Sequence, residues 1–334
     1  MDQPTMPTRH VPRPRAASPV LVWTAIVILY VVWGSTYLGI RVAVDTIPPF
    51  VMAAIRFAIA GTIMLGAVGL FRRDSVTRPT RREWRDSFIV GTCLMGGGMG
   101  AVAWGELTVP SGIAGILIAM LPVWVAVFGR VFLGERLPRL AIVGIAAGVL
   151  GVVILVGPGL ATGGNLDPAG VAALIFSPMS WAAGSLFSAH RARLPRDPFL
   201  TTGMQMVSGA AVLTVAAILS GEVAGFRPEA VEPDSVVALV YLTVVGSLVA
   251  FTAFAWVLRH APLPLIATYA FVNPIVAVFL GWLILAEAVT PIQLVAGAVI
   301  VVGVALLILS RSRMSAPSAT SRPVNRDEDA AAAA

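Results

Sequence analysis

The sequence predicts an all-α integral membrane protein whose ten transmembrane helices form two inverted five-helix repeats. Of its 334 residues, 57% are hydrophobic and only 12% are charged, whereas about a quarter of the residues in a soluble domain are charged. The apolar residues gather in ten runs of about 20 residues, the length that crosses roughly 30 Å of hydrocarbon. In addition, features of the first half of the chain recur in the second.

The apolar runs are continuous and lack the period-two alternation of a membrane barrel, so each is expected to be a helix. The expected spans are residues 20–40, 49–71, 87–106, 111–133, 140–156, 168–190, 199–219, 235–258, 264–285 and 291–310. Residues 20–157 then form the first repeat and residues 168–310 the second. Residues 1–19 and 311–334 are expected to be disordered tails.

Arginine placement predicts the orientation. All 23 basic residues are arginine. With the N-terminus inside, all of them except Arg41, Arg56 and Arg227 fall in the tails or in cytoplasmic loops. Basic residues favour the cytoplasmic side of a membrane, so both termini are expected there.

A shift of 152 positions, without a gap, superposes residues of the two halves. The informative pairs are Trp104 with Trp256, Pro110 with Pro262, Pro122 with Pro274 and Glu135 with Glu287. A looser shift of 148 or 149 pairs Trp33 with Trp181 and sets Arg56 opposite Gln205. Five spans is an odd number, so the second repeat enters the membrane from the opposite side. Inverted repeats are typical of secondary transporters, whose substrate site lies near the midplane.

Other classes of protein fit less well. The three histidines lie outside or at the edges of the spans, no HExxH or GxSxG motif occurs, and Cys93 is the single cysteine. We therefore expect no enzyme activity, metal or cofactor, and the chain has no basic face for nucleic acid. A lipid scramblase is the alternative function, and a sensor is less favoured because no extramembrane domain is present. Monomer and homodimer both remain open.

Several short motifs carry a family resemblance. They are Trp33-Gly34-Ser35-Thr36-Tyr37, Ile55-Arg56-Phe57, Ala60-Gly61, Pro110-Ser111-Gly112, Gly134-Glu135-Arg136, Ser180-Trp181, Gly184-Ser185, Tyr269-Ala270-Phe271-Val272-Asn273-Pro274 and Glu287. With them the chain resembles the drug/metabolite transporter superfamily in its ten-helix EamA-type family, most of all the bacterial inner-membrane metabolite exporters. The resemblance implies a central cavity that faces each side alternately, and transport of amino acids, related metabolites or drug-like compounds.

Two prolines are expected to bend helices. Proline removes a hydrogen bond within a helix, and Pro122 and Pro274 would free the carbonyls of Ile118 and Ala270. Because the pair recurs, we expect bends that line the pathway and take part in gating. A packing kink satisfied by neighbouring helices is the alternative.

Two charged residues are candidates for the pathway. Arg56 lies about seven residues into its span, roughly 10 Å deep, where an unpaired arginine costs about 2.5 kcal/mol or more. It would hold a substrate carboxylate or pair with an acid such as Asp45 or Glu106. A structural ion pair for Arg56 and a solvated interfacial carboxylate for Glu106 are the alternatives.

Aromatic and small polar side chains complete the predicted pathway. Trp33, Tyr37, Trp181 and Tyr269 are expected to form aromatic walls, although such residues also serve as lipid-facing anchors. The polar contacts are expected from Ser35, Thr36 and Asn273, for which interhelical hydrogen bonding is the alternative.

The recurring acids Glu135 and Glu287 are expected to be structural. Each precedes a helix start, near Pro138 and Pro291, where a carboxylate interacts favourably with the helix dipole. The first span contains no Asp or Glu, so the first-span carboxylate of proton-driven small multidrug relatives has no counterpart. This favours facilitated exchange or a proton route through Glu106.

Overall fold

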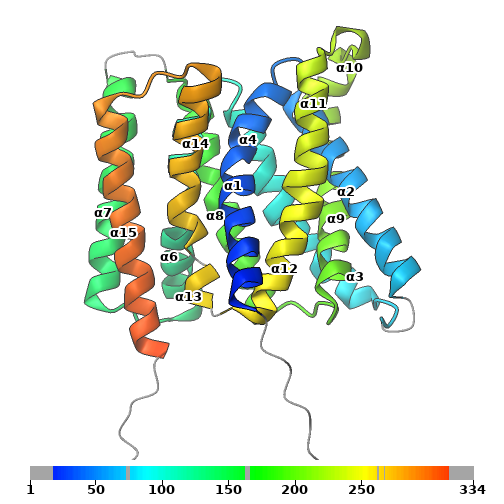
Figure 1. Ribbon diagram of the computed structural model, residues 1–334, viewed down its shortest axis with the longest axis horizontal. Coiled ribbons are helices and arrows are strands. Elements are labelled where there is room, and N and C mark those ends of the chain that lie inside the picture. The colour runs from blue at the N-terminus through cyan, green and yellow to red at the C-terminus, as the bar shows by residue number, and fades with distance from the viewer. Residues whose placement is uncertain (1–17, 73–75, 162–165, 262, 267, 316–334) are drawn as a thin grey trace, which may run out of the picture.

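The computed structural model describes residues 18–315 except 73–75, 162–165, 262 and 267 (Figure 1). Every regular element in these residues is a helix. Nine helices are long and apolar enough to cross a membrane, and the shorter apolar helix Tyr269–Leu285 is the tenth candidate. The predicted all-α membrane fold is confirmed in the described part of the chain.

Four of the ten spans consist of several consecutive helical segments. The first half contains α1 (Pro19–Ala43), α2 (Pro49–Phe71), a third span of α3 (Arg81–Gly91), η2 (Thr92–Met99) and α4 (Gly100–Gly105), a fourth of α5 (Ser111–Ile118) and α6 (Leu121–Leu133), and α7 (Arg139–Ala161). The second half contains α8 (Pro168–His190), α9 (Pro198–Leu219), an eighth span of α11 (Pro233–Tyr241), η4 (Leu242–Val249) and α12 (Ala250–His260), a ninth of α13 (Leu263–Ile266) and α14 (Tyr269–Leu285), and α15 (Pro291–Ser315). The short helices α10 (Glu222–Gly225) and η3 (Pro228–Ala230) connect α9 to α11.

The third span begins at Arg81, and the predicted start at residue 87 is wrong. Thr80 and Glu83 form a capping box: the Thr80 hydroxyl accepts from the Glu83 N–H (3.2 Å), and the Glu83 carboxylate accepts from the Thr80 N–H (2.7 Å). Such a box satisfies otherwise unpaired N–H groups. It therefore extends the helix into a polar turn that hydropathy alone excludes.

The third and eighth spans each contain a π-helical segment. These segments, η2 and η4, lie at similar places in the two halves. In η4 the Ser247 hydroxyl donates to the Leu242 carbonyl, five residues earlier, at 3.0 Å. π-Helical turns are rare and occur frequently at functional sites.

The fourth and ninth spans are interrupted at different places relative to their prolines. In the fourth, α5 ends at Ile118 and α6 begins at Leu121, so Pro122 lies in the first turn of a new helix, where proline is well tolerated. In the ninth, the interruption lies between Ile266 and Tyr269, and Pro274 lies inside α14. The two prolines therefore occupy different places in their helices, and the bends expected at them stay predictions.

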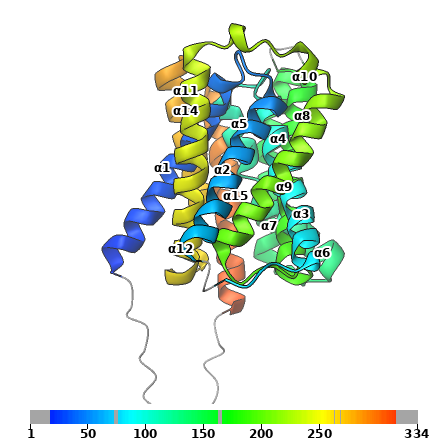
Figure 2. The ribbon, with the colours of Figure 1, turned by 90° about the vertical axis from the view of Figure 1, so that its right-hand side faces the viewer.

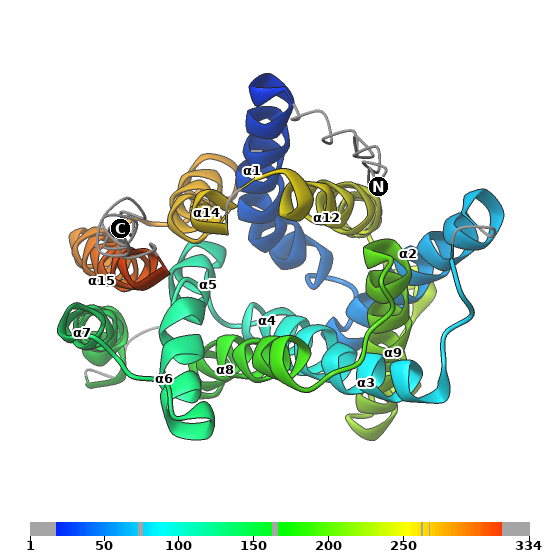
Figure 3. The same ribbon diagram turned by 90° about the horizontal axis from the view of Figure 1, so that it is seen from below.

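Helices of each half pack against helices of the other half. Along the bundle axis, α7 pairs with α15 on one side and α2 with α9 on the other (Figure 3); α2 and α9 also lie side by side in Figure 2. Between these pairs, α1 packs against α11, α12 and α14, while α8 packs against η2, α4 and α6. The first helix of each half thus contacts the third and fourth spans of the other half.

Helices α1 and α8 run in opposite directions. Arg41, near the end of α1, donates to the carbonyl of Glu106 at the end of α4. Close by, Thr108 donates to Asp167, which caps the start of α8, so α8 begins where α1 finishes. The start of α1 and the end of α15 lie at the opposite end (Figure 1). We refer to these two ends as the α10 end and the terminal end.

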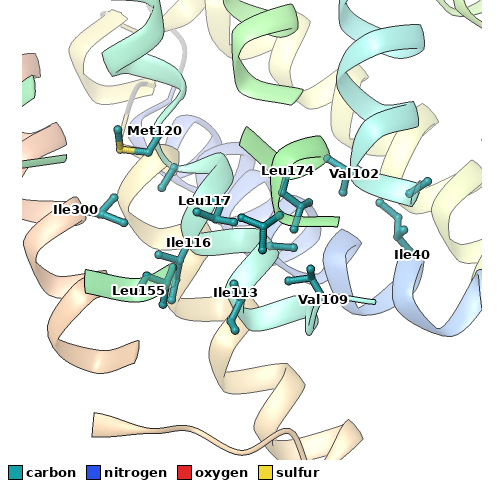
Figure 4. Close-up of a cluster of buried hydrophobic side chains, with 14 of the residues drawn as sticks. Ile40, Val102, Val109, Ile113, Ile116, Leu117, Met120, Leu155, Leu174 and Ile300 are labelled. Carbon is teal, nitrogen blue, oxygen red and sulfur yellow. The ribbon is translucent and has the colours of Figure 1, made fainter. Parts of the chain in front are cut away.

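Apolar side chains fill the space between the helices. Leu117 and Leu174 are almost completely buried and lie in one cluster with Ile113, Val102 and Ile300 (Figure 4). Large apolar side chains such as Phe71, Phe132 and Trp282 lie on the outer surface. An apolar exterior around an apolar interior is the arrangement required in lipid.

Candidate substrate site

Arg56 lies buried inside the bundle. It belongs to α2 and is 2% exposed. Its Nε–H donates to the Ser247 hydroxyl at 3.0 Å, and its guanidinium carbon lies 4.9 Å from the centre of the Phe57 ring. No ion pair joins it to Asp45, to Glu106 or to another described carboxylate. A buried cation with one neutral partner is costly, by about 2.5 kcal/mol or more at membrane depth.

Ser247 positions Arg56 from the other half of the chain. Its hydroxyl donates to Leu242 within η4 and accepts from Arg56, so the π-helical geometry orients the acceptor. The neighbouring residue, Gly246, has no side chain, and this lets the backbone of η4 lie close to the guanidinium of Arg56. A Cβ atom there would lie 3.3 Å from Nη2 of Arg56 and 3.2 Å from Cγ2 of Thr36.

A second polar contact joins the halves next to this point. The hydroxyls of Ser35 in α1 and Tyr241 in α11 lie 2.5 Å apart. Ser35 and Thr36 also donate to main-chain carbonyls one turn earlier in α1, at Val32 and Trp33. Ser35 and Thr36 were predicted to supply polar contacts, but the sequence did not identify Tyr241 as the partner of Ser35.

An aromatic cluster lies beside these polar groups. The Trp33 ring centre is 5.6 Å from Phe251, 5.1 Å from Phe254 and 5.1 Å from Tyr269, with mostly tilted or edge-on geometry. These distances suit attractive aromatic pairs. Two of the predicted aromatic residues, Trp33 and Tyr269, thus contact each other, and their role as a wall of the pathway stays a prediction.

Asn273 is buried where α14 meets α1. Its side chain is 7% exposed, and its Oδ1 has no hydrogen-bond partner in the described residues. A Cβ atom at Gly34 would lie 3.3 Å from the main-chain oxygen of Asn273, so α1 and α14 approach closely here. Buried polar atoms are nearly always paired, which makes this oxygen a candidate ligand contact.

Trp181 and Tyr37 lie apart from the aromatic cluster. A Cβ atom built on Gly98 in η2 would lie 3.0 Å from the Trp181 ring. Tyr37 packs beside Gly115 in α5. The structure therefore does not bring the four predicted aromatic residues to one place.

Glu106 lies buried at the α10 end. Its side chain has no exposed surface, and neither carboxylate oxygen has a hydrogen-bond partner within the described ranges. Arg41 donates to the main-chain carbonyl of Glu106 (3.1 Å) and not to its carboxylate. Among the described residues no salt bridge joins Glu106 to Arg41 or to Arg56, the partner considered from the sequence.

A cavity of about 450 Å³ lies near Glu106. Both halves line it, including Arg41, Asp45, Thr108, Ser235 and Glu287. Its size is comparable to that of small-molecule pockets.

Glu287 caps a helix of the other half. Its carboxylate accepts from the N–H of Ser111 (2.8 Å), the hydroxyl of Ser111 (2.9 Å) and the N–H of Gly112 (3.0 Å). The helix that it caps is α5, whereas the sequence pattern predicted that it acts on the helix that follows Glu287. A similar cap lies at the same end of the bundle, where Glu222 accepts from the N–H groups of Phe50 and Val51 at the start of α2. Burial raises the pKa of Glu222.

Glu135 lies against Gly129 in the first half. A Cβ atom on Gly129 would lie 2.6 Å from its Oε2, as one on Gly281 would lie 2.4 Å from Oε2 of Glu287. The two recurring acids thus fold back on equivalent glycines, which explains part of the repeat signal.

Sequence reasoning missed Ser247, Tyr241, Phe251 and Phe254. All four belong to the eighth span, where one serine and a few aromatic residues in an apolar run look like ordinary packing. The available signal was the Gly246-Ser247 pair at mid-span, because a small residue beside a polar one permits close approach.

The fold and these contacts define a polytopic membrane transporter. The sequence model of the EamA-like transporter family matches residues 21–157 and, a second time, residues 168–309. The chain belongs to this family, within the drug/metabolite transporter superfamily.

Relatives agree with this assignment. The chain is 34% identical over 290 residues to the uncharacterized inner membrane transporter YedA of Escherichia coli K12, covering 86% of this chain and 90% of YedA. It is 26% identical over 286 residues to a probable terminal-alkyne amino-acid exporter of Streptantibioticus cattleyicolor, covering 86% and 92%. A solved crystal structure has the same fold, with a TM-score of 0.59 and 23% identity over 91% of this chain and 100% of that one.

Proposed function

We propose that the protein is a secondary transporter that exports small organic metabolites, such as amino acids, related metabolites or drug-like compounds, across the bacterial cytoplasmic membrane by alternating access. The observation that carries this proposal is the contact between Arg56 and Ser247, which joins the two halves through a buried charged group. Aromatic and polar side chains surround it, as expected of a small-molecule site.

The inverted-repeat architecture is part of the proposal. It is supported by the two matches of the family model, by the opposite directions of α1 and α8, and by the exchange of first helices between the halves. Rocking of such halves about a central site gives alternating access. The cavity at the α10 end, lined by both halves, would then be the opening on the outer side.

The proposed orientation places the terminal end in the cytoplasm. The start of α3, which carries Arg81, Arg82 and Arg85, lies at this end (Figure 1). Basic loops favour the cytoplasmic side.

For coupling, we propose facilitated exchange or a proton route through Glu106. Counterflow with and without a proton gradient distinguishes the two, since strict dependence on the gradient contradicts facilitation.

The transport function is tested by efflux over a panel of metabolites and drugs. Cells with the intact protein should export a subset of the panel, and cells with Arg56→Ala combined with Asn273→Ala should retain that subset. Arg81→Gln is the matched control, because Arg81 is exposed at the start of α3. Equal retention of every compound by cells with and without the intact protein would contradict transport, and lipid flipping in reconstituted vesicles without metabolite movement would favour a scramblase.

A further inference from the structure

Arg56 has more hydrogen-bonding capacity than its surroundings use. A guanidinium has five N–H donors. In the described residues only the Nε–H is matched, by the neutral hydroxyl of Ser247. No described carboxylate forms an ion pair with Arg56. Among the residues that the structure describes, this buried positive charge therefore has no counterion.

The charge is not a requirement of helix packing. The sequence repeat sets Arg56 in α2 opposite Gln205 in α9, and both side chains are buried, at 2% and 8% exposure. The two helices pack along each other through close glycine contacts at Gly61 and Gly203. A neutral amide thus suits the equivalent position, and the cation at Arg56 needs another explanation.

The groups near Arg56 indicate which chemical features a ligand at this position would have. Because Gly246 has no side chain, the backbone of η4 approaches Nη2 of Arg56 closely: a Cβ atom there would lie 3.3 Å away. One turn further along the eighth span, Phe251 leads to the aromatic cluster with Trp33, Phe254 and Tyr269. A cationic group and an apolar wall on neighbouring helices fit a molecule with an anionic end and an apolar body.

We propose that Arg56 selects substrates that carry a carboxylate, and that the apolar part of the substrate lies against the Trp33, Phe251, Phe254 and Tyr269 rings. A guanidinium binds a carboxylate through two parallel hydrogen bonds, so the substrate supplies the counterion that the protein lacks. Ser247 holds the guanidinium in place between substrates. This inference rests on the proposed transport function and adds the substrate class to it.

The test is counterflow in proteoliposomes with matched pairs of a carboxylate and its primary amide: phenylalanine with phenylalaninamide, leucine with leucinamide, and phenylacetate with phenylacetamide. The intact protein should prefer the carboxylate by about 30-fold or more, the loss expected when one partner of a buried charged pair is removed. Arg56→Gln, which copies Gln205, should abolish the preference, and Arg56→Lys should keep part of it. Arg81→Gln is the control and should keep all of it.

Three results would overturn the inference. They are equal transport of acids and amides by the intact protein, a preference that survives in a folded Arg56→Gln variant, and movement of only neutral or cationic compounds from the wider panel. Each leaves the transport function standing. Absence of any transported compound in both assays would instead contradict the transport function itself. Size-exclusion profiles establish that each variant is folded, and inhibition of residual transport by phenylacetate gives a second measure of anion binding.

Discussion

The carboxylate of Glu287 binds the main-chain N–H of Ser111, although 176 residues separate them in the sequence. The contact ties the end of α14 to the start of α5 and so links the two halves at the α10 end. A carboxylate at a helix N-terminus satisfies free N–H groups and interacts favourably with the helix dipole.

Glu287→Ala should therefore lower the stability of the protein by about 1–2 kcal/mol. The measurement is the midpoint of thermal unfolding in detergent. Glu229→Ala is the control, because Glu229 is exposed in η3. An unchanged midpoint in Glu287→Ala would show that the cap does not stabilise the bundle.

Ser247→Ala should leave Arg56 without its one hydrogen-bond partner. A buried donor left unpaired costs about 1–3 kcal/mol, so both stability and the transport rate should fall. Ser208→Ala is a matched control, since Ser208 is also buried and donates only to the Met204 carbonyl. Similar effects of the two substitutions would contradict a special role for Ser247.

Gly246→Ala should impair transport, because the new methyl group would lie 3.3 Å from Nη2 of Arg56 and 3.2 Å from Cγ2 of Thr36. Gly66→Ala in α2 meets nothing within 4 Å, and it should stabilise its helix by about 0.5–1 kcal/mol. The transport rate and the unfolding midpoint are measured on both variants and compared with those of the intact protein. Full activity in Gly246→Ala would mean that this space is not used.

Glu106→Met should raise the unfolding midpoint while it slows or uncouples transport. The carboxylate is fully buried and unpaired, and an apolar group of similar shape avoids its desolvation cost. Glu106→Gln keeps the shape of the side chain and removes the carboxyl group, so the same two measurements on it distinguish an effect of the carboxyl from an effect of shape. A less stable Glu106→Met variant with normal transport would show that Glu106 serves packing alone.

Asp167 should make the start of α8 sensitive to acid. Hydrogen bonds from the N–H groups of Gly170 and Ala169 lower the pKa of Asp167. A carboxylate whose pKa is depressed in the folded state contributes stability above its unfolded pKa, about 3.9, and that stability is lost as the pH falls through the folded value. The gap in unfolding midpoint between the intact protein and Asp167→Asn should therefore be largest near neutral pH and close below about pH 4. A gap that is independent of pH would contradict this assignment.

The sequence predicted the ten apolar helices in the described part of the chain, because apolar length is a local signal. It did not predict the partner of Glu287, since that contact depends on how α14 packs beside α5. The π-helical segments and the Arg56–Ser247 contact were missed for a related reason. Apart from the adjacent Gly246, nothing in this apolar run distinguishes a serine that also orients a cation from one that bonds only to its own helix.

The exchange of first helices between the halves has a consequence for biosynthesis. Ser35 in α1 meets Tyr241 in α11, 206 residues later in the chain. At 5–20 residues per second, the ribosome needs about 10–40 s to make that stretch. During this time α1 already lies in the bilayer without α11, α12 and α14, which cover most of its buried face, so a chain released early would leave much of that face exposed to lipid or to quality-control proteases.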